Sequence, residues 1–320
     1  MKKRGVSRFF ILAVFTVIVI AFFHPVFLKG FIPFPGDLLL AEYQPWRSTS
    51  FNNITAGAVP NKAQYFDTLR QLYPWKTYFI DAVKNGIFPL WNPHNFSGSP
   101  LFANFQSALL FPLNLFYFLL PQYISWTILI ILQPFLCLAT VYFLSRIYGL
   151  SKTASVFSAV SYAFSLYMTT FLEYNIMGHF MYLLPLTMLA IELIIKKKTW
   201  AYLLLTASIT LSAFAGHTQL FAGIIAYALI YGAIRSFQTY ETYKKRVYFF
   251  LVLLFFIFAG IGMSGIQLLP GIELIFHSAR SSHVPEFFYN NLLIKPVQIV
   301  LYFVPDLFGN PANKNYLIPF

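Results

Sequence analysis

The chain has 320 residues, of which 58% are hydrophobic and only 10% are charged, and its formal net charge is +12. Soluble domains carry roughly 45–50% apolar and about 25% charged residues, so this chain has too few charges for a soluble protein and too much hydrophobicity for a disordered one. Its basic residues lie between apolar runs, as the residues that set membrane topology do, and they do not form a nucleic-acid-binding surface. We therefore expect an all-α, polytopic helical membrane protein with a single transmembrane domain over 1–320 and no nucleic-acid partner.

The first apolar run covers Phe9–Leu28 and follows a cluster of basic residues at the N-terminus. It is too long for a signal peptide and no small-residue cleavage site follows it, so we interpret it as an uncleaved helix that begins inside the cell. Later runs approach the roughly 20 residues that a membrane-spanning helix needs. They lie at 123–145, 153–172, 179–195, 199–215, 217–235 and 247–269, which gives about seven transmembrane helices.

The segment 104–120 decides the predicted topology. It is apolar but contains Asn104, Gln106, Pro112 and Asn114, and we interpret it as re-entrant or interfacial. With this segment not crossing, the Lys and Arg clusters of all later turns fall inside, as the positive-inside rule requires. Eight of the ten acidic residues then face outward, namely Asp37, Glu42, Asp67, Asp81, Glu173, Glu273, Glu286 and Asp306.

The first outer loop, 30–103, is the only large polar segment of the chain. Its aromatic content argues against disorder, and a connection this long usually has a function of its own. The apolar spacing within 62–86 predicts two short interfacial helices. Pro74 suits the first turn of the second helix, and Gly86 suits its C-terminal cap.

Two acids of this loop are candidate catalytic residues. Asp37 follows Pro35-Gly36 just beyond the first helix, at the depth where a lipid-linked sugar presents its reactive bond. A carboxylate there could deprotonate an acceptor hydroxyl or hold a divalent cation against phosphate, but it could also simply form a turn. Asp67 could be a second catalytic acid, or it could form an i, i+3 ion pair with Arg70. No metal site is specified by this pattern.

Three further ionisable residues, Glu173, His179 and His217, lie at the outer ends of predicted spans. Such groups are costly at span ends unless they are hydrated or used. The histidines could bind phosphate, ligate a metal or transfer protons, and each could equally be an interfacial histidine with one hydrogen bond. The outer cations could hold a lipid-linked phosphate or ordinary anionic headgroups; they are Lys62, Arg70, Lys76 and Arg280.

Several short pieces, in their order, resemble the bacterial YfhO family and its relatives in the GT-C glycosyltransferase superfamily. No single piece is specific, but the resemblance extends over nearly the whole chain. The pieces are Pro35-Gly36-Asp37, Gln71-Leu72-Tyr73-Pro74-Trp75, Pro89-Leu90-Trp91-Asn92-Pro93, 96–104 with Gln106, Pro112-Leu113-Asn114, Gly216-His217-Thr218-Gln219 and Pro305-Asp306-Leu307-Phe308-Gly309-Asn310-Pro311.

The resemblance implies transfer of a sugar from a polyprenyl-phosphate donor to a glycan, lipid or protein acceptor of the cell envelope, on the outer face of the bacterial cytoplasmic membrane. It also implies that the first outer loop carries the catalytic acid, which corresponds to Asp37, with Asp67 as a less secure second acid. We expect substrate contacts from Arg70, His179, His217, Glu173 and Gln106. Family members are usually longer, so we also expect these 320 residues to be the N-terminal part of a larger protein.

Two other functions remain open at this point. A flippase or transporter of lipid-linked sugars would need a continuous polar path, which the predicted spans barely supply. A non-catalytic scaffold for envelope assembly would tolerate substitution of Asp37, His179 and His217. No Walker A motif occurs, which argues against a nucleotide-driven pump.

Overall fold

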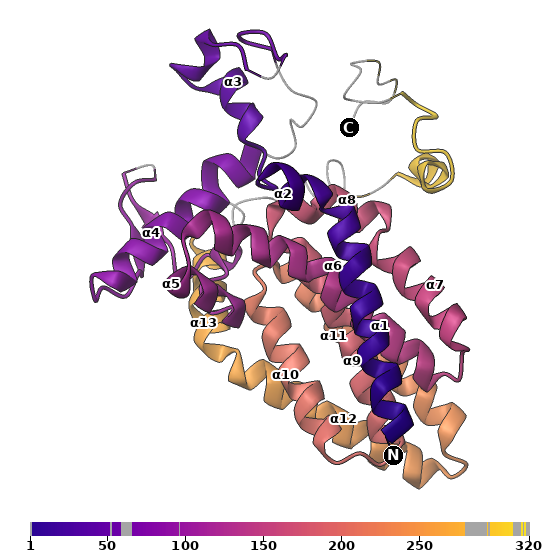
Figure 1. Cartoon of the computed structure of the whole chain (residues 1–320). Helices are drawn as coiled ribbons and strands as arrows, with labels where there is room; N and C mark the ends of the chain where they lie inside the picture. The colour runs from indigo at the N-terminus through magenta and orange to yellow at the C-terminus, as the bar shows by residue number, and fades with distance from the viewer. Residues whose placement is uncertain are drawn as a thin grey trace.

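The computed structural model describes residues 2–51, 53–58, 66–95, 97–278, 293, 295–309, 315 and 317, with side chains described from residue 9 onward. This part of the chain is mostly helical (Figure 1). Its longer helices are α1 (Lys2–Phe22), α4 (Tyr73–Lys84), α6 (Gln122–Ile147), α7 (Lys152–Ala163), α9 (Met177–Ile195), α10 (Trp200–Phe214), α11 (Thr218–Thr239), α12 (Tyr243–Met263) and α13 (Gly265–Phe276).

Four of these helices, α6, α9, α11 and α12, are long and apolar enough to cross a membrane. A fifth span results if α7 and α8 (Leu166–Phe171), which are bent by 41°, count as one. The described apolar part of α1, Phe9–Phe22, and α10 are shorter than span length. The membrane-protein prediction is thus supported by span-length helices, whereas the count of seven spans stays a prediction.

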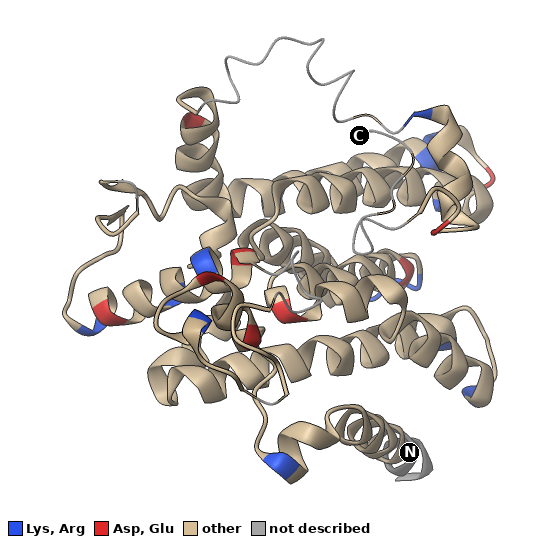
Figure 2. Cartoon of the chain, turned by 90° about the horizontal axis from the view of Figure 1, so that it is seen from above, with Lys and Arg blue, Asp and Glu red and all other residues tan. Residues whose placement is uncertain are grey.

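Consecutive long helices run in opposite directions, so their connections gather at two ends of the bundle. The turns 148–151, 196–199 and 240–242 lie at what we call the basic end, and the segments 30–121, 172–176 and 215–217 lie at the opposite end, which we call the loop end. Lys and Arg outnumber the acids in and beside the turns of the basic end, and Figure 2 shows acidic and basic residues close together among the loop-end segments on its left. The N-terminus of α1 is at the basic end (Figure 1).

Three predicted spans are interrupted at specific residues. Residues 9–28 divide at Phe23 into α1 and α2 (His24–Lys29), because Pro25 lacks an N–H and its ring crowds the preceding turn. The run 153–172 divides into α7 and α8 at Phe164–Ser165. The run 247–269 was predicted as one helix, but α12 ends at Met263 and α13 begins at Gly265. The glycine-rich stretch around Ser264 has low helix propensity, which favours this break.

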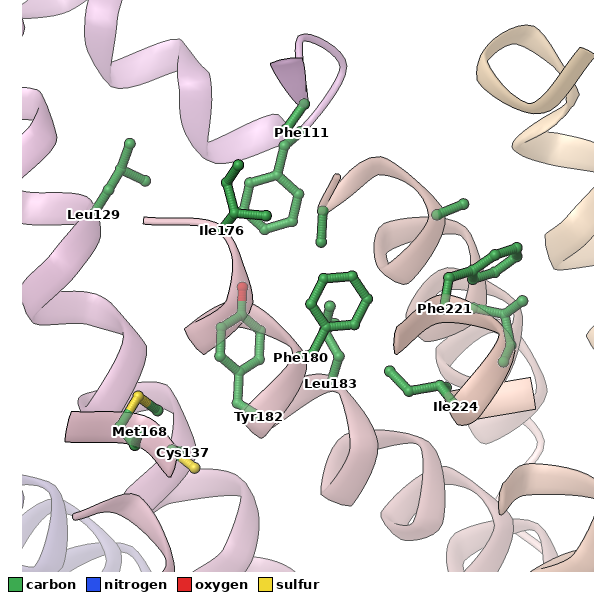
Figure 3. Close-up of a cluster of buried hydrophobic side chains, with 14 of the residues drawn as sticks. Phe111, Leu129, Cys137, Met168, Ile176, Phe180, Tyr182, Leu183, Phe221 and Ile224 are labelled. Carbon is green, nitrogen blue, oxygen red and sulfur yellow. The ribbon is translucent and has the colours of Figure 1, made fainter. Parts of the chain in front are cut away.

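The hydrophobic core is centred on α9, which packs against α6, α10 and α11. Figure 3 shows Phe111 of the 104–120 segment pointing toward Ile176 and Phe180 at the start of α9. All three side chains are at most 5% exposed. The segment 104–120 therefore contributes to the same core as the long helices.

The first long loop contains several short elements at the loop end (Figure 1). They are the 3-10 helices η1 (Gly36–Leu38) and η2 (Trp46–Ser48), the short helix α3 (Leu39–Glu42), the π-helical segment η4 (Thr68–Leu72) and the antiparallel strands β1 (Trp91–Asn92) and β2 (Ser99–Pro100). The described residues of 62–86 form two helical elements, with Pro74 in the first turn of the second as predicted, but the first is π-helical and continues into α4 without a break. Pro74 would clash with the carbonyl of Arg70 in a regular α-helix, and a wider π turn relieves this clash. Gly86 does follow α4 in the left-handed conformation, with φ +73°.

The segment 104–120 forms only short helices at the loop end. They are η5 (Phe105–Ser107), η6 (Pro112–Leu115) and α5 (Phe116–Leu119). None of them has the length of a membrane span. Whether this segment enters a membrane stays a prediction, as does the interfacial position of α4. A further 3-10 helix, η9, covers Pro296–Tyr302.

The close packing of α10 against α12 gives a test of this fold. A Cβ on Gly260 would lie 2.8 Å from both the backbone oxygen of Thr206 and the Cβ of Ile209. Thr210 Oγ1 also donates a hydrogen bond to the Gly260 carbonyl at 3.0 Å. Small residues of this kind let helices in membranes approach closely. We expect Gly260→Ala to reduce stability by about 1–3 kcal/mol, because two rigid backbones must separate.

The matched control lies two residues further along the same helix. A Cβ on Gly262 meets no atom within 4 Å. Gly262→Ala should therefore be neutral or slightly stabilising, since alanine is the better helix former. Thermal unfolding in lipid nanodiscs, followed by tryptophan fluorescence, measures both variants. Equal stability of the two variants would contradict the packing described here.

Candidate functional site

A cavity of about 270 Å³ with a mixed polar and apolar lining lies at the loop end, where three distant segments meet. Its walls come from the residues around η5, from the turn before α11 and from α13. The lining residues are Ala103, Asn104, Phe105, Gln106, Gly216, His217, Thr218, Gln219, Gly271, Leu274, Ile275 and Ser278.

The turn before α11 is shaped by close packing. Gly216 has φ +95°, and a Cβ on it would lie 2.9 Å from both the Cβ of Ala108 and the backbone oxygen of Phe105. Only glycine fits both the conformation and the space. His217 then caps α11, because its Nδ1 accepts a hydrogen bond from the backbone N–H of Leu220 at 3.5 Å. This cap satisfies one of the N–H groups that a helix N-terminus leaves without a partner.

The wall formed by α13 is held against the 102–105 segment by two contacts. Gln267 Nε2 donates to the backbone oxygen of Phe102 at 2.8 Å, and a Cβ on Gly271 would lie 2.3 Å from the ring of Phe105. The cavity-lining residues of α13 are spaced by three or four positions, so they occupy one face of that helix. The break between α12 and α13 at Ser264 thus allows α13 to form a wall of the cavity.

Gln106 and His217 are the two predicted site residues that line this cavity. Gln106 is exposed, and its backbone N–H is held by the side chain of Asn104 at 3.1 Å. Asn104 and Gln219 lie in two of the short sequence pieces given above, 96–104 and Gly216-His217-Thr218-Gln219, although neither was predicted as a site residue. No feature of the sequence indicated Ser278 as a site residue.

A second group of predicted site residues surrounds η4. Arg70 forms an ion pair with Glu42 of α3, and not the i, i+3 pair with Asp67 that the sequence left open. Asp67 instead accepts a hydrogen bond from Gln71 Nε2 at 3.3 Å. Glu173 lies in the 3-10 helix η7 (Leu172–Tyr174), which packs against η4. Glu42, one of the acids predicted to face outward, therefore joins α3 to η4.

Asp37 lies in the first turn of η1, directly before α3, and its side chain is half-buried. The segment before it is anchored to the bundle. Trp126 Nε1 donates to the backbone oxygen of Pro33 at 3.2 Å, and the ring of Phe34 packs against Tyr73 at 4.9 Å between centroids. Leu38 has no exposed surface. The backbone around Asp37 is thus fixed, and Asp37 is not one of the cavity-lining residues.

His179 lies in the core, where it is only 2% exposed. Its Nδ1 is 3.2 Å from the hydroxyl of Tyr182, and its ring packs on Phe111 at 4.5 Å between centroids. A further hydrogen bond joins His179 to the backbone of Asn175, so His179 is a core histidine and not an interfacial one with a single hydrogen bond. The structure does not place His179 in the cavity with His217.

Lys76 was expected to be an outer cation available to phosphate, and this expectation is wrong. Its side chain is only 7% exposed. Its Nζ donates to the backbone oxygen of Ser107 at 2.7 Å and to Asn114 Oδ1 at 3.2 Å. Lys76 therefore fastens α4 to the 104–120 segment. Lys62 and Arg280, the other two cations of that set besides Arg70, lie outside the described residues.

Burial of Lys76 lowers its pKa to about 7. Between pH 7 and the ordinary pKa of 10.5, the unfolded chain binds a proton that the folded chain does not. Stability should therefore rise with pH across this window, by at most about 1.4 kcal/mol per pH unit for one proton. Below pH 7 both states carry the proton and this contribution is constant.

The Lys76→Met variant should lose this rise in stability, because it has no proton to release. The control is Lys84→Met, which removes an exposed lysine from the last turn of the same helix. Thermal unfolding between pH 7 and pH 10 compares the variants with the unchanged chain. If Lys76→Met and Lys84→Met show the same pH dependence, the buried lysine does not titrate as described.

Within the described ranges, no group of three or more His, Cys, Asp or Glu side chains is placed to hold a metal ion. A divalent cation therefore stays an open element of the predicted site. Comparison of the chain with protein-family models, with curated proteins and with solved structures found no match.

Proposed function

We propose that this chain is an integral-membrane glycosyltransferase with about seven spans and an inside N-terminus. It moves a sugar from a polyprenyl-phosphate donor to a glycan, lipid or protein acceptor of the bacterial cell envelope. The observation that carries this proposal is the cavity at the loop end, which is lined by amide, hydroxyl and apolar groups and lies in the same half of the molecule as the acid-bearing first loop. Uncharged polar side chains suit a sugar, and a carboxylate at the same end of the molecule suits removal of a proton from an acceptor.

In the proposed reaction, the Asp37 carboxylate takes the proton of an acceptor hydroxyl. The hydroxyl oxygen forms a bond to the anomeric carbon of the donor sugar. The bond between that carbon and the phosphate oxygen breaks, and polyprenyl phosphate leaves with the electron pair. Arg70, held by Glu42 beside the same segment, supplies a positive charge for the phosphate, and Gln106 and His217 contact the sugar. Asp67 and Glu173 flank η4 as further polar contacts.

The charge distribution supports an outward-facing loop end. Cations dominate the turns at the basic end, and cations are retained on the cytoplasmic side of membranes. Many large apolar side chains of α11 and α12 are exposed, including Tyr227, Ile230, Phe255 and Phe258, as expected for helices that face lipid. The ordered sequence pieces that resemble the YfhO family support the same donor and the same membrane face.

A reconstituted transfer assay tests the proposal. The purified chain in proteoliposomes is supplied with labelled polyprenyl-phosphate sugars and a membrane-envelope extract as the source of acceptor. We expect label to appear in a product that no longer contains the polyprenyl chain. Movement of intact labelled lipid across the bilayer without any sugar transfer would reject the glycosyltransferase proposal and support a flippase.

A further inference from the structure

The described residues that line the loop-end cavity include amide and hydroxyl groups, and none of these described residues is Lys, Arg, Asp or Glu. Its amide groups come from Asn104, Gln106 and Gln219, and its hydroxyl groups come from Thr218 and Ser278. Each amide offers donors and an acceptor, and each hydroxyl can do both. Such a lining matches a ligand whose own groups both donate and accept hydrogen bonds.

The imidazole of His217 fits this uncharged lining. Its Nδ1 accepts the N–H of Leu220, so Nδ1 carries no proton while the cap is formed. When Nδ1 accepts this bond, Nε2 is the ring nitrogen that carries a proton and acts as a donor. A protonated imidazole would lose the cap of α11.

The apolar part of the lining completes the match. Phe105, Leu274 and Ile275 face the same cavity as the amides and hydroxyls. Pyranose rings present both hydroxyl groups and C–H faces, so a mixed lining of this kind can contact both. A phosphate, in contrast, would lose its hydration here without gaining a Lys or Arg partner from the described part of the lining, which is unfavourable.

We propose that this cavity binds the uncharged sugar ring of a lipid-linked substrate and excludes its phosphate. This inference rests on the proposed function and names the part of the substrate that the cavity takes. The volume of about 270 Å³ lies below the roughly 300–1,000 Å³ of sites for drug-sized ligands, so the cavity holds one ring and not the polyprenyl chain. The phosphate and the reacting bond then lie at the mouth, outside the lining residues.

Protection of an introduced cysteine tests the inference on the full chain in nanodiscs. Thr218→Cys places a thiol in the lining at the first residue of α11, where a helix N-terminus favours the reactive thiolate. The native Cys137 has no exposed surface and adds little background labelling. Lys84→Cys, exposed at the end of α4 and outside the cavity, is the matched control for nonspecific effects.

The probes are a panel of methyl glycopyranosides, with inorganic phosphate and pyrophosphate as comparators. We expect at least one glycoside to slow maleimide labelling of Cys at position 218 severalfold, in a saturable way, and to leave the Lys84→Cys control unchanged. Adding Gln219→Ala should remove this protection. Protection by phosphate or pyrophosphate without protection by glycosides would overturn the inference, and so would no protection by any probe.

A measurement on the unchanged chain guards against a misfolded cysteine variant. Saturation-transfer difference NMR detects binding of the same methyl glycosides at millimolar affinity, and Gln219→Ala should weaken the signal. Neither experiment requires catalysis. Glycoside binding in a protein that transfers no sugar would reject the proposed function only. Sugar transfer by a protein whose cavity binds no glycoside would reject this inference only.

Discussion

Asp37→Asn is expected to lower sugar transfer by about 10²–10⁴-fold, the usual contribution of a general base. The amide has nearly the shape of the carboxylate but does not accept the proton of the acceptor hydroxyl. The surrounding backbone is anchored independently of this side chain, through Leu38 in the core and through the bond from Trp126 to Pro33. The variant should therefore remain folded and still bind substrate.

Initial rates of label transfer in proteoliposomes measure this effect, with thermal unfolding as the check on folding. Glu241→Gln, at an exposed acid of the basic end, is the matched control and should transfer at the unchanged rate. Asp67→Asn separates the two candidate acids, since Asp67 is exposed and bonded to Gln71. Normal transfer by a folded Asp37→Asn variant would remove Asp37 from the mechanism.

Glu192→Ala is expected to destabilise the fold by about 1.5–3 kcal/mol, because it removes the charged acceptor of several hydrogen bonds while the partly exposed Arg235 stays hydrated. Glu192 of α9 is only 2% exposed and receives two bonds from Arg235 of α11, from Nε to Oε1 at 2.5 Å and from Nη2 to Oε2 at 3.0 Å. Tyr231 also donates to Glu192 and is itself bonded to Tyr148. Removal of this carboxylate affects the whole cluster near the basic end.

A second variant separates the effect of the ion pair from that of the hydrogen bonds. Glu192→Met combined with Arg235→Met removes both charges and should recover most of the lost stability, because apolar side chains replace buried ion pairs at little cost. Glu241→Ala, at an exposed acid of the same end, should change stability by less than about 0.5 kcal/mol. Thermal unfolding in nanodiscs measures all three. If the double variant is no more stable than Glu192→Ala alone, the cluster stabilises the fold through its hydrogen bonds and not through its ion pair.

Much of the candidate site could not be predicted from the sequence, because its contacts join residues far apart in the chain. Lys76 and Arg70 look alike in the sequence, as outer cations on one helical segment. In the structure, Lys76 is buried against the 104–120 segment, whereas Arg70 pairs with Glu42 from the preceding loop. His179 and His217 both follow a glycine at a predicted span end, yet one lies in the core and the other in the cavity wall.

The sequence by itself determined the helical class, the positions of the span-length helices and the basic character of one end of the bundle. Each of these follows from a sum over consecutive residues, since the length of an apolar run and the charge of a short turn are local quantities. The tertiary structure alone decided which polar residues share a cavity. For example, the bond from Gln267 to Phe102 holds α13 in the position where it forms one wall of the cavity. Pairing and burial depend on which surfaces meet after the helices pack, and no run of neighbouring residues encodes that.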